Sequence, residues 1–394
     1  MSFSEWKEIK LGELLNFRRG HDLPKTKMLD GNIPVVGSNG IIGFHNEVTT
    51  KAPCLTIGRS GNIGNPCYIN KDCWAHNTSL YVDDFKGNDP KYLYYLLKTL
   101  NLGHYGGGSA VPTLNRNHIH PIEIKATINL AEQKAIAHIL STLDDKIEVN
   151  NQINKTLDNM AQAIFKQWFM DFEFPNEDGE PYKSSGGEMV ESELGMIPKG
   201  WEVKGLDEIA EFLNGLAMQK YRPTENEKSY PVLKIKELRQ GRTDENSDLC
   251  SSNIEKKYIV RDGDIIFSWS GSLLVDIWCG GKCGLNQHLF KVTSDKHDQW
   301  FVYQWNKYHL DRFVNIAKSK ATTMGHIKRK DLSDSKVLIP SDELYLKAAQ
   351  YQKYLFEKIM YSKIEIKRLE EIRDSLLPKL MSGEIRVPLN EEGD

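Results

Sequence analysis

An internal repeat is the feature that most constrains the fold of this chain. The segment Trp6–Leu14 matches Trp201–Ile209, and Phe17 and Gly20 fall opposite Phe212 and Gly215. Further matches follow in the same order: Pro34–Val36 with Pro231–Leu233, Leu55–Gly61 with Ile265–Gly271, Asn77 and Leu80 with Asn286 and Leu289, and Leu114–Ile119 with Ile327–Leu332. This order predicts two diverged copies of about 200 residues each. The matched positions are mostly Trp, Gly and aliphatic, as in a shared core, whereas the polar positions between them differ.

Each copy begins with a Gly-rich part that predicts a small sheet domain. Short apolar runs such as Ala52–Ile57 and Ile265–Ser268 are typical of strands joined by turns. One helix is expected in each copy, near Pro90–Lys98 and near Gln299–Phe313, and Asp89 and Pro90 have the residue types of a helix cap and first turn.

Each copy ends with a pattern that predicts a long helix. No Gly or Pro occurs for about 40 residues after Ile128, and seam residues recur at alternating steps of four and three. The first helix has seam residues Ile136, Leu140, Leu143, Ile147, Asn150, Asn154, Leu157, Ala161, Ile164 and Trp168, and the second has Leu355, Ile359, Ser362, Ile366, Leu369, Arg373, Leu376 and Leu380. Pro378 is expected to kink or end the second helix, and Gly383 to stop it.

We therefore predict an α+β fold with two similar globular domains, each a mixed sheet with short helices, separated by two long helices. The helices are expected to form an antiparallel coiled coil, with one globular domain at each end and polar seam residues fixing the register. The predicted boundaries are 1–128 for the first domain, 129–172 for the first long helix, 173–198 for an exposed acidic linker, 199–343 for the second domain, 344–385 for the second long helix and 386–394 for a tail.

The charge distribution points toward nucleic acid more strongly than the net charge of -3 does. Segment 173–198 carries seven acidic residues against one lysine, and the tail carries three more. The remainder is net basic. Segment 312–330 holds six basic residues and no acidic one, and segment 91–122 also lacks acidic residues. Because these runs fall in corresponding parts of the repeat, a phosphate-binding surface in each copy is a better explanation than chance.

Motifs for catalysis are weak or missing. The Gly-rich segment Gly58–Gly64 lacks the Lys-Ser/Thr of a phosphate loop. Two groups could hold a metal, Cys67 with Cys73 and His76, and Cys279 with Cys283 and His288, but neither supplies four ligands in regular spacing, so buried free thiols are expected. With no membrane-length apolar run and no secretion signal at the start, the chain is expected to be cytoplasmic with reduced cysteines.

Several of these segments resemble the specificity (S) subunit of type I restriction–modification systems. The matching segments are Trp6 with Leu11–Leu14, Leu130–Gln133, Ile164–Phe169, Glu193–Trp201 and Leu376–Ile385. The chain departs from the pattern where Ala349-Gln350 stands opposite Glu132-Gln133. Such a resemblance, over essentially the whole chain, implies two target-recognition domains, each reading one half of a split, asymmetric double-stranded DNA sequence.

The resemblance also implies that this chain is a non-catalytic subunit. It would bind two methyltransferase subunits, and two restriction subunits could join. The chain itself would hold no cofactor or metal, while the other subunits would use S-adenosylmethionine, ATP and Mg²⁺. The partner surface is expected along both long helices.

From the basic, aromatic and amide residues of each copy we predict the DNA contacts. In the first domain they are Arg18, Arg19, His21, Lys25, Lys27, Arg59, Asn62 and Arg116. In the second domain they are Lys220, Arg222, Trp269, Lys318, Lys320, His326, Lys328 and Arg329. Affinity requires cations near phosphates, and specificity requires side chains at base edges.

Two other classes of function stay open at this point. One is a self-sufficient nuclease or methyltransferase that uses Glu123 and Lys125 or the segment Asn88–Tyr92. The other is a coiled-coil scaffold that binds only protein. Salt-sensitive DNA binding would separate a DNA reader from a scaffold, and turnover by the purified chain would separate an enzyme from both.

Overall fold

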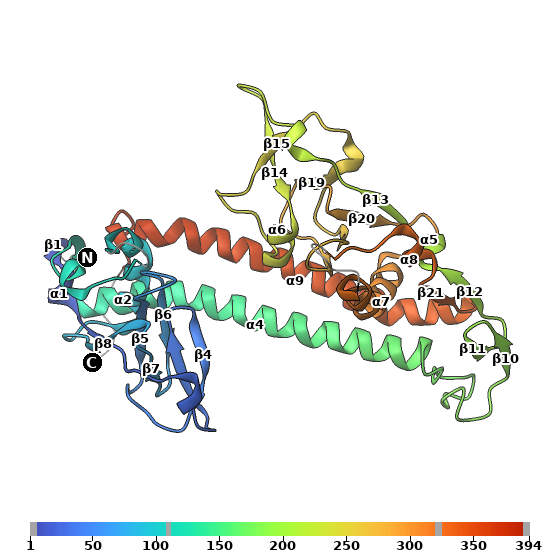
Figure 1. Cartoon of the computed structure of the whole chain (residues 1–394), viewed down its shortest axis with the longest axis horizontal. Coiled ribbons are helices and arrows are strands. Elements are labelled where there is room, and N and C mark those ends of the chain that lie inside the picture. The colour runs from blue at the N-terminus through green and yellow to red at the C-terminus, as the bar shows by residue number, and fades with distance from the viewer. Residues whose placement is uncertain (1–5, 108–111, 320–324, 389–394) are drawn as a thin grey trace. The chain divides into compact units, whose positions relative to one another are not determined.

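The computed structural model describes residues 6–107, 112–319 and 325–388 (Figure 1). It divides into two compact units: unit 1 comprises 1–146 and 369–394, and unit 2 comprises 147–368. The long helices α4 (Leu130–Phe169) and α9 (Asp342–Ser382) each contribute one part to each unit. The predicted α+β fold with two sheet domains and two long helices is confirmed.

Unit 1 contains two mixed or antiparallel sheets and a separate strand pair. The four-stranded sheet has the order β2 (Asn16–Arg19), β8 (Ser79–Asp84), β5 (Cys54–Gly58), β6 (Pro66–Ile69). The three-stranded sheet has the order β4 (Gly40–His45), β3 (Ile33–Gly37), β7 (Trp74–Ala75), and β1 (Trp6–Lys10) pairs with β9 (Glu123–Thr127). The short helices are α1 (Leu11–Leu14), α2 (Pro90–Thr99) and α3 (Arg116–Ile119). The Asp89 side chain caps α2 by accepting the Tyr92 N–H at 2.8 Å, as predicted.

Unit 2 repeats this topology. Its main sheet has the order β13 (Glu211–Asn214), β20 (Leu289–Thr293), β17 (Ile265–Ser268), β18 (Leu274–Ile277). A second sheet has the order β15 (Leu249–Ser251), β14 (Ser229–Leu233), β19 (Cys283–Leu285), β16 (Ile259–Val260), and β12 (Glu202–Gly205) pairs with β21 (Lys336–Ile339). The short helices are α5 (Leu206–Ile209), α6 (Ile235–Gln240) and α8 (Arg329–Ser333), and α7 (Gln299–Ser319) packs against the sheet.

Strand pairing confirms the repeat and corrects one detail of it. Phe17 pairs with Val82 in unit 1, and Phe212 pairs with Val292 in unit 2. Likewise Ile57 pairs with Leu80, and Phe267 with Phe290. Leu80 therefore corresponds to Phe290 rather than to Leu289, so the sequence match of Asn77 and Leu80 was wrong by one residue. Asn77 corresponds to Gln287.

The long helices pack antiparallel within each unit. In unit 1 the Arg373 guanidinium contacts the Asp144 carboxylate at 2.8 Å, and Arg386, just after α9, contacts Glu132 at 2.8 Å. In unit 2 the Asn150 amide donates to Glu365 at 2.8 Å, and the Gln352 amide donates to the Ala161 carbonyl at 2.8 Å. Along α4 the contact residues run from lower to higher numbers, while their partners on and just after α9 run from higher to lower numbers, so the two helices are antiparallel. The predicted seam positions of both helices are buried or half-buried throughout.

Local signals explain where the long helices begin and end. The Asn129 side chain accepts the N–H groups of Ala131 and Glu132 at 3.0 and 3.1 Å, which satisfies free donors at the start of α4. Gly383 has φ +73° and directly follows α9, as predicted for its stop. Pro378 lies inside α9 and does not end it.

The acidic segment between the copies is folded rather than an irregular linker. Strands β10 (Met189–Ser192) and β11 (Gly195–Pro198) form an antiparallel hairpin. The Phe174 ring stacks on Tyr182 and on Trp201, with centroids 4.5 and 5.7 Å apart. Sequence reasoning weighed the acidic residues of this segment and missed its aromatic ones, which attach it to the core of unit 2.

Among the residues that the structure describes, no helix is both long and apolar enough to cross a membrane. The six cysteines are free thiols, and all except Cys67 are buried.

Candidate nucleic-acid interface

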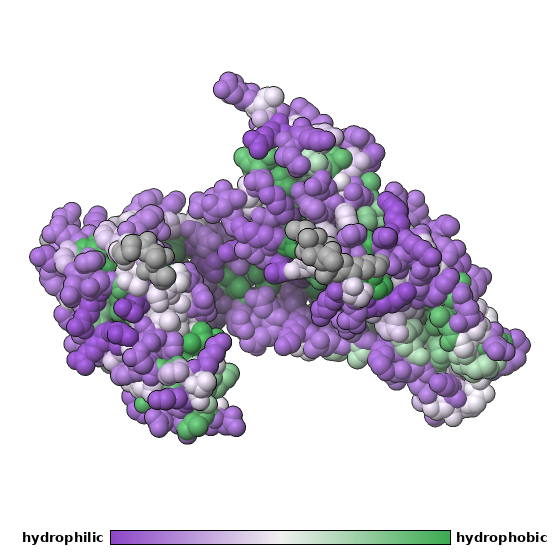
Figure 2. All heavy atoms as spheres, in the orientation of Figure 1, coloured by the Kyte–Doolittle hydropathy of each residue, from purple (hydrophilic) through white to green (hydrophobic). Residues whose placement is uncertain are grey.

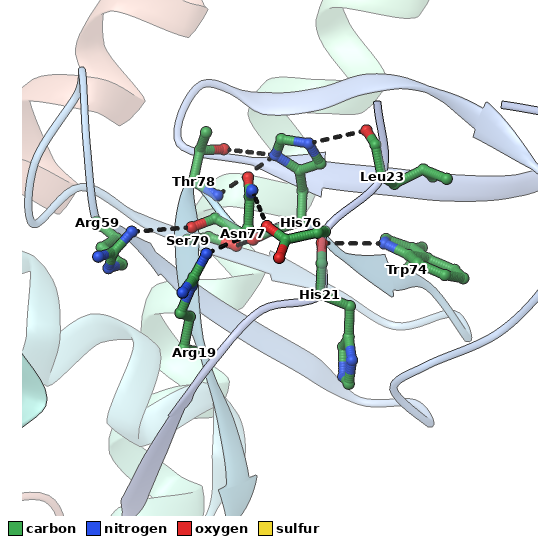
Figure 3. A network of polar contacts seen from close by, with 10 residues as sticks. Arg19, His21, Leu23, Arg59, Trp74, His76, Asn77, Thr78 and Ser79 are labelled. Atoms are coloured by element: carbon green, nitrogen blue, oxygen red, sulfur yellow. Dashed lines mark hydrogen bonds and ion pairs between the residues drawn. The ribbon is translucent and has the colours of Figure 1, made fainter. Parts of the chain in front are cut away.

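Three loops of unit 1 meet around the turn His76–Ser79 (Figure 3). The His21 N–H donates to the Ala75 carbonyl at 2.7 Å, and the Asn77 N–H donates back to His21 at 2.9 Å. The Arg59 N–H donates to Thr78 at 2.8 Å, and the Arg59 carbonyl accepts the Leu114 N–H at 2.8 Å. We call this set of backbone hydrogen bonds the frame. It brings the ends of β2 and β5 and the segment before α3 together, although they are far apart in the sequence.

Unit 2 contains the same frame. The Leu216 N–H donates to Leu285 at 2.9 Å, and the Gln287 N–H donates to Leu216 at 2.8 Å. The Trp269 N–H donates to His288 at 3.3 Å, and the Trp269 carbonyl accepts the Ile327 N–H at 3.1 Å. Each bond has its counterpart in unit 1.

A glycine permits the close approach on which each frame depends. A Cβ atom at Gly20 would lie 2.1 Å from the His76 carbonyl oxygen, and one at Gly215 would lie 2.2 Å from that of Asn286. Both glycines matched in the sequence repeat, and the reason is this contact between backbones.

The frame of unit 1 carries paired and unpaired cations. Arg18 forms an ion pair with Asp83 at 2.5 Å, and Arg19 forms one with Asp22 at 3.1 Å. A hydrogen bond from Asn77, with the charge of Arg19, lowers the pKa of Asp22, so this carboxylate stays ionised at neutral pH. Arg59 differs: in the part of the chain that the structure describes its guanidinium makes one hydrogen bond, 3.4 Å long, to the Asn77 carbonyl, and no ion pair.

At the position where the unit 1 frame has Arg59, the unit 2 frame has the aromatic residue Trp269. Trp269 stacks on Phe290 with centroids 5.6 Å apart, and its indole N–H donates to the Asn214 side chain at 2.9 Å. His326 meets the Trp269 ring edge-on at 6.4 Å. A neighbouring cavity of about 510 Å³ is lined by Arg222, Asn286 and other residues.

The structure places the predicted contact residues in both units but does not gather all of them. Arg19, His21 and Arg59 lie at the unit 1 frame (Figure 3), and Trp269 and His326 lie at the unit 2 frame. The others are exposed at other places in the two units. They are Lys25 and Lys27 on a short helix, Asn62 beside a separate cavity of about 290 Å³, Lys220 and Arg222 after β13, Lys318 at the end of α7, and Lys328 before α8. Lys320 lies outside the described residues.

Arg116 and Arg329 occupy equivalent positions and make the same bond. The Arg116 guanidinium donates to the Phe17 carbonyl at 3.2 Å, and that of Arg329 donates to the Phe212 carbonyl at 3.3 Å. Arg329 also lies over the Phe290 ring, 6.0 Å from its centroid. A shared bond to the backbone gives both arginines a role in supporting the frame, which the basic runs alone did not suggest.

Sequence reasoning missed an apolar surface on unit 1. Strand β4 lies at the edge of its sheet and exposes Ile41, Ile42 and Phe44, with 52, 38 and 55% of their surface accessible. Figure 2 shows hydrophobic spheres among hydrophilic ones on the part of unit 1 where Figure 1 places β4. The apolar residues of Gly40–His45 were the available signal, but strands usually bury such residues.

One of the two segments weighed for catalysis has a structural role. The Asn88 side chain donates to the Leu14 carbonyl at 2.8 Å and accepts from Gln133 at 2.8 Å, and Tyr92 is fully buried. Glu123 and Lys125 lie on β9, which pairs with β1. Within the described residues no three His, Cys, Asp or Glu side chains gather as a metal site.

Comparison with known proteins agrees with this arrangement. A family model described as "Type I restriction modification DNA specificity domain" matches residues 3–159 and 198–372. The MjaIX specificity subunit of a type I restriction enzyme from Methanocaldococcus jannaschii is 34% identical, over 75% of this chain and 69% of that protein. The HindI specificity subunit from Haemophilus influenzae is 24% identical, over 97% of this chain and all of that protein.

The fold is also similar to a solved one. The crystal structure of a type I restriction–modification S subunit from M. genitalium superposes with a TM-score of 0.61 at 19% identity, over 96% of each chain. With the family model covering both copies of the repeat, this chain belongs to the family of type I restriction–modification DNA specificity subunits, which are the non-catalytic, sequence-selecting components of these systems.

Proposed function

We propose that this chain recognises a split, asymmetric DNA sequence, with one half-site bound at the frame of each unit. The proposal assigns target recognition to residues 1–128 and 199–343 and the spacer role to the two long helices. It rests on one observation above the others: the same hydrogen-bonded frame occurs twice, with different side chains on it. Two copies that bound the same ligand would have little reason to differ there.

Phosphate contacts fall to exposed cations around each frame. In unit 1 these are Arg18, Lys25 and Lys27, and in unit 2 they are Lys220, Arg222, Lys318 and Lys328. Lys320 is included from its place in the basic run, and Asn62 is included as a base contact of the first domain. Cations of this kind supply affinity without sequence information, and they make binding depend steeply on salt.

The long helices offer a surface for the partner subunits. Tyr351, Tyr354 and Tyr361 on α9 expose 52, 57 and 61% of their surface, and their spacing of three and seven residues places them on one helix face. Val149, Ile153 and Met160 on α4 are also exposed. Exposed apolar side chains gathered on a helix are typical of protein docking. The partners proposed are two methyltransferase subunits and, where present, two restriction subunits, which would use S-adenosylmethionine, ATP and Mg²⁺.

Methylome sequencing tests the proposal directly. Adenine methylation is compared between host cells with this gene, without it, and with it restored on a plasmid. We expect one split motif to lose its methyl groups without the gene and to regain them on restoration. If every methylated motif persists without the gene, the proposed function is wrong.

Salt dependence provides a second, independent test. The complex assembled with its methyltransferase subunits is titrated with a duplex that carries the motif, from about 50 to 200 mM salt. A reader that contacts six or more phosphates should lose on the order of a thousandfold in affinity over this range. A salt-insensitive affinity would favour a protein-binding scaffold instead.

A further inference from the structure

The two frames hold different side chains at equivalent positions, each exposed or half-buried. Three pairs of positions are fixed by matching backbone contacts: His21 with Leu216, Arg59 with Trp269, and Thr113 with His326. The third pair is defined by the isolated bridges Ser60 to Thr113 and Ser270 to His326. At each pair the backbone is the same and the side-chain chemistry changes.

The residues that build the frame, in contrast, are of the same type in both units. Phe17 and Phe212 are both buried, and Gly20 and Gly215 both permit a backbone contact that a Cβ atom would block. Arg116 and Arg329 both donate to the carbonyl of the matching phenylalanine. Structure is thus retained between the copies while the chemistry at the three pairs diverges, as expected where one scaffold serves two ligands.

We propose that these three pairs of positions determine which bases each domain accepts, and that Arg59 and Trp269 make the largest difference between the two half-sites. The inference rests on the proposed function, since it names the residues that would carry out its sequence selection. It separates them from the exposed cations, which it assigns to phosphates, and from Arg116 and Arg329, which support the frame itself.

The free donors of Arg59 suit a guanine. In the described part of the chain this guanidinium forms only the 3.4 Å bond to the Asn77 carbonyl, whereas Arg18 and Arg19 are paired with carboxylates. A guanidinium with free N–H groups can donate two hydrogen bonds to O6 and N7 of guanine in the major groove. We therefore expect the half-site of the first domain to contain a guanine that depends on Arg59.

Trp269 cannot make that contact. Its indole N–H is already donated to Asn214 at 2.9 Å, and its ring is held against Phe290. The accessible part of a half-buried indole is apolar, so it suits a thymine methyl group or the face of a base. The matching position of the second half-site should therefore not be read as guanine.

The test uses the full chain assembled with its methyltransferase subunits and reads the methylated motif by sequencing. In Arg59→Gln the amide prefers adenine, so one guanine of the first half-site should be replaced by adenine or become degenerate, with a ten- to hundredfold fall in discrimination. The second half-site and the spacing should stay unchanged. Lys51→Gln is the matched control, because Lys51 is an exposed cation of the same unit paired with Asp72 at 2.8 Å, away from the frame.

Further variants keep the inference falsifiable if Arg59→Gln assembles poorly. Arg59→Lys keeps the charge but loses the paired donors, so it should retain affinity and still relax the guanine. Trp269→Phe keeps a ring to stack on Phe290 and should alter only the second half-site.

The possible outcomes separate this inference from the proposed function. An unchanged motif in both Arg59 variants, or a uniform loss of methylation at an unchanged motif, would refute the specificity role while the wild-type motif still supports a DNA reader. Absence of any motif in the wild type would refute the proposed function itself.

Discussion

The ion pair between α4 and α9 in unit 1 allows a quantitative test of how the long helices are held in register. Arg373 contacts Asp144 at 2.8 Å, and their side chains are only 16 and 28% exposed. The second carboxylate oxygen of Asp144 accepts the Tyr95 hydroxyl at 2.6 Å. The variant Arg373→Met removes the guanidinium and keeps most of the apolar length, which leaves the carboxylate largely shielded from water and without its opposite charge.

The burial of the pair sets the expected cost. An exposed ion pair contributes about 0–1 kcal/mol to folding stability, whereas removing one partner of a fully buried pair lowers that stability by about 3–5 kcal/mol. A pair that is about three-quarters buried should lie between these limits, so we expect Arg373→Met to lower local stability by about 2–3 kcal/mol. Asp144→Asn removes the charge and keeps an acceptor for Tyr95. Adding it to Arg373→Met should therefore recover at least about 1 kcal/mol.

Hydrogen exchange of the α4 amides from Ile136 to Ile147 measures this cost without requiring the whole chain to unfold in one step. Lys379→Met is the control, because Lys379 and Glu384 lie 3.9 Å apart and are 46 and 66% exposed, so it should cost less than about 0.5 kcal/mol. Equal protection in Arg373→Met and in the control, or strictly additive effects of the two substitutions in the pair, would refute the argument.

Two other predictions concern unit 2 and the unit 1 frame. Burial lowers the pKa of His309 from 6.5 to about 4, and its neutral ring donates to the Lys336 carbonyl at 2.9 Å. On acidification the His309 ring is protonated at a higher pH in the unfolded chain than in the folded chain. The free energy of unfolding should therefore fall by up to about 3 kcal/mol as the pH is lowered from 6.5 to 4. His309→Gln should flatten this dependence in urea unfolding, and an unchanged slope would contradict it. Gly20→Ala places a Cβ 2.1 Å from the His76 carbonyl oxygen and should cost about 1–3 kcal/mol in thermal unfolding. Gly107→Ala, whose added Cβ has no atom of the described residues within 4 Å, should cost less than about 0.5 kcal/mol, and equal melting temperatures for the two would argue against the close contact.

The large features of this fold could be predicted because they depend on periodic or repeated residues. The steps of four and three along each long helix reflect the geometry of helix packing, and they survive even where Asn150 and Arg373 replace apolar residues. Trp6 and Trp201, or Gly20 and Gly215, mark the repeat because a core position or a close backbone contact admits few residue types.

Features set by the pairing of distant segments could not be predicted in the same way. A one-residue change in the turn before β20 shifts Asn286 out of register with Asn77, and only the partner strand reveals it. The role of Arg116 depends on a carbonyl 99 positions away in the sequence, so a basic run cannot distinguish it from Arg59. The acidic residues of segment 173–198 suggested an exposed linker, while three aromatic rings decide its packing.

The discontinuous make-up of unit 1 has a consequence for synthesis of the chain. Its core includes Leu380, Met381 and Val387, and Arg386 forms an ion pair at 2.8 Å with Glu132, which is almost fully buried. These residues leave the ribosome only after the whole of unit 2 has been made. Unit 1, which is translated first, is therefore completed last, and a frameshift or early stop after residue 368 would damage unit 1 while leaving the sequence of unit 2 intact.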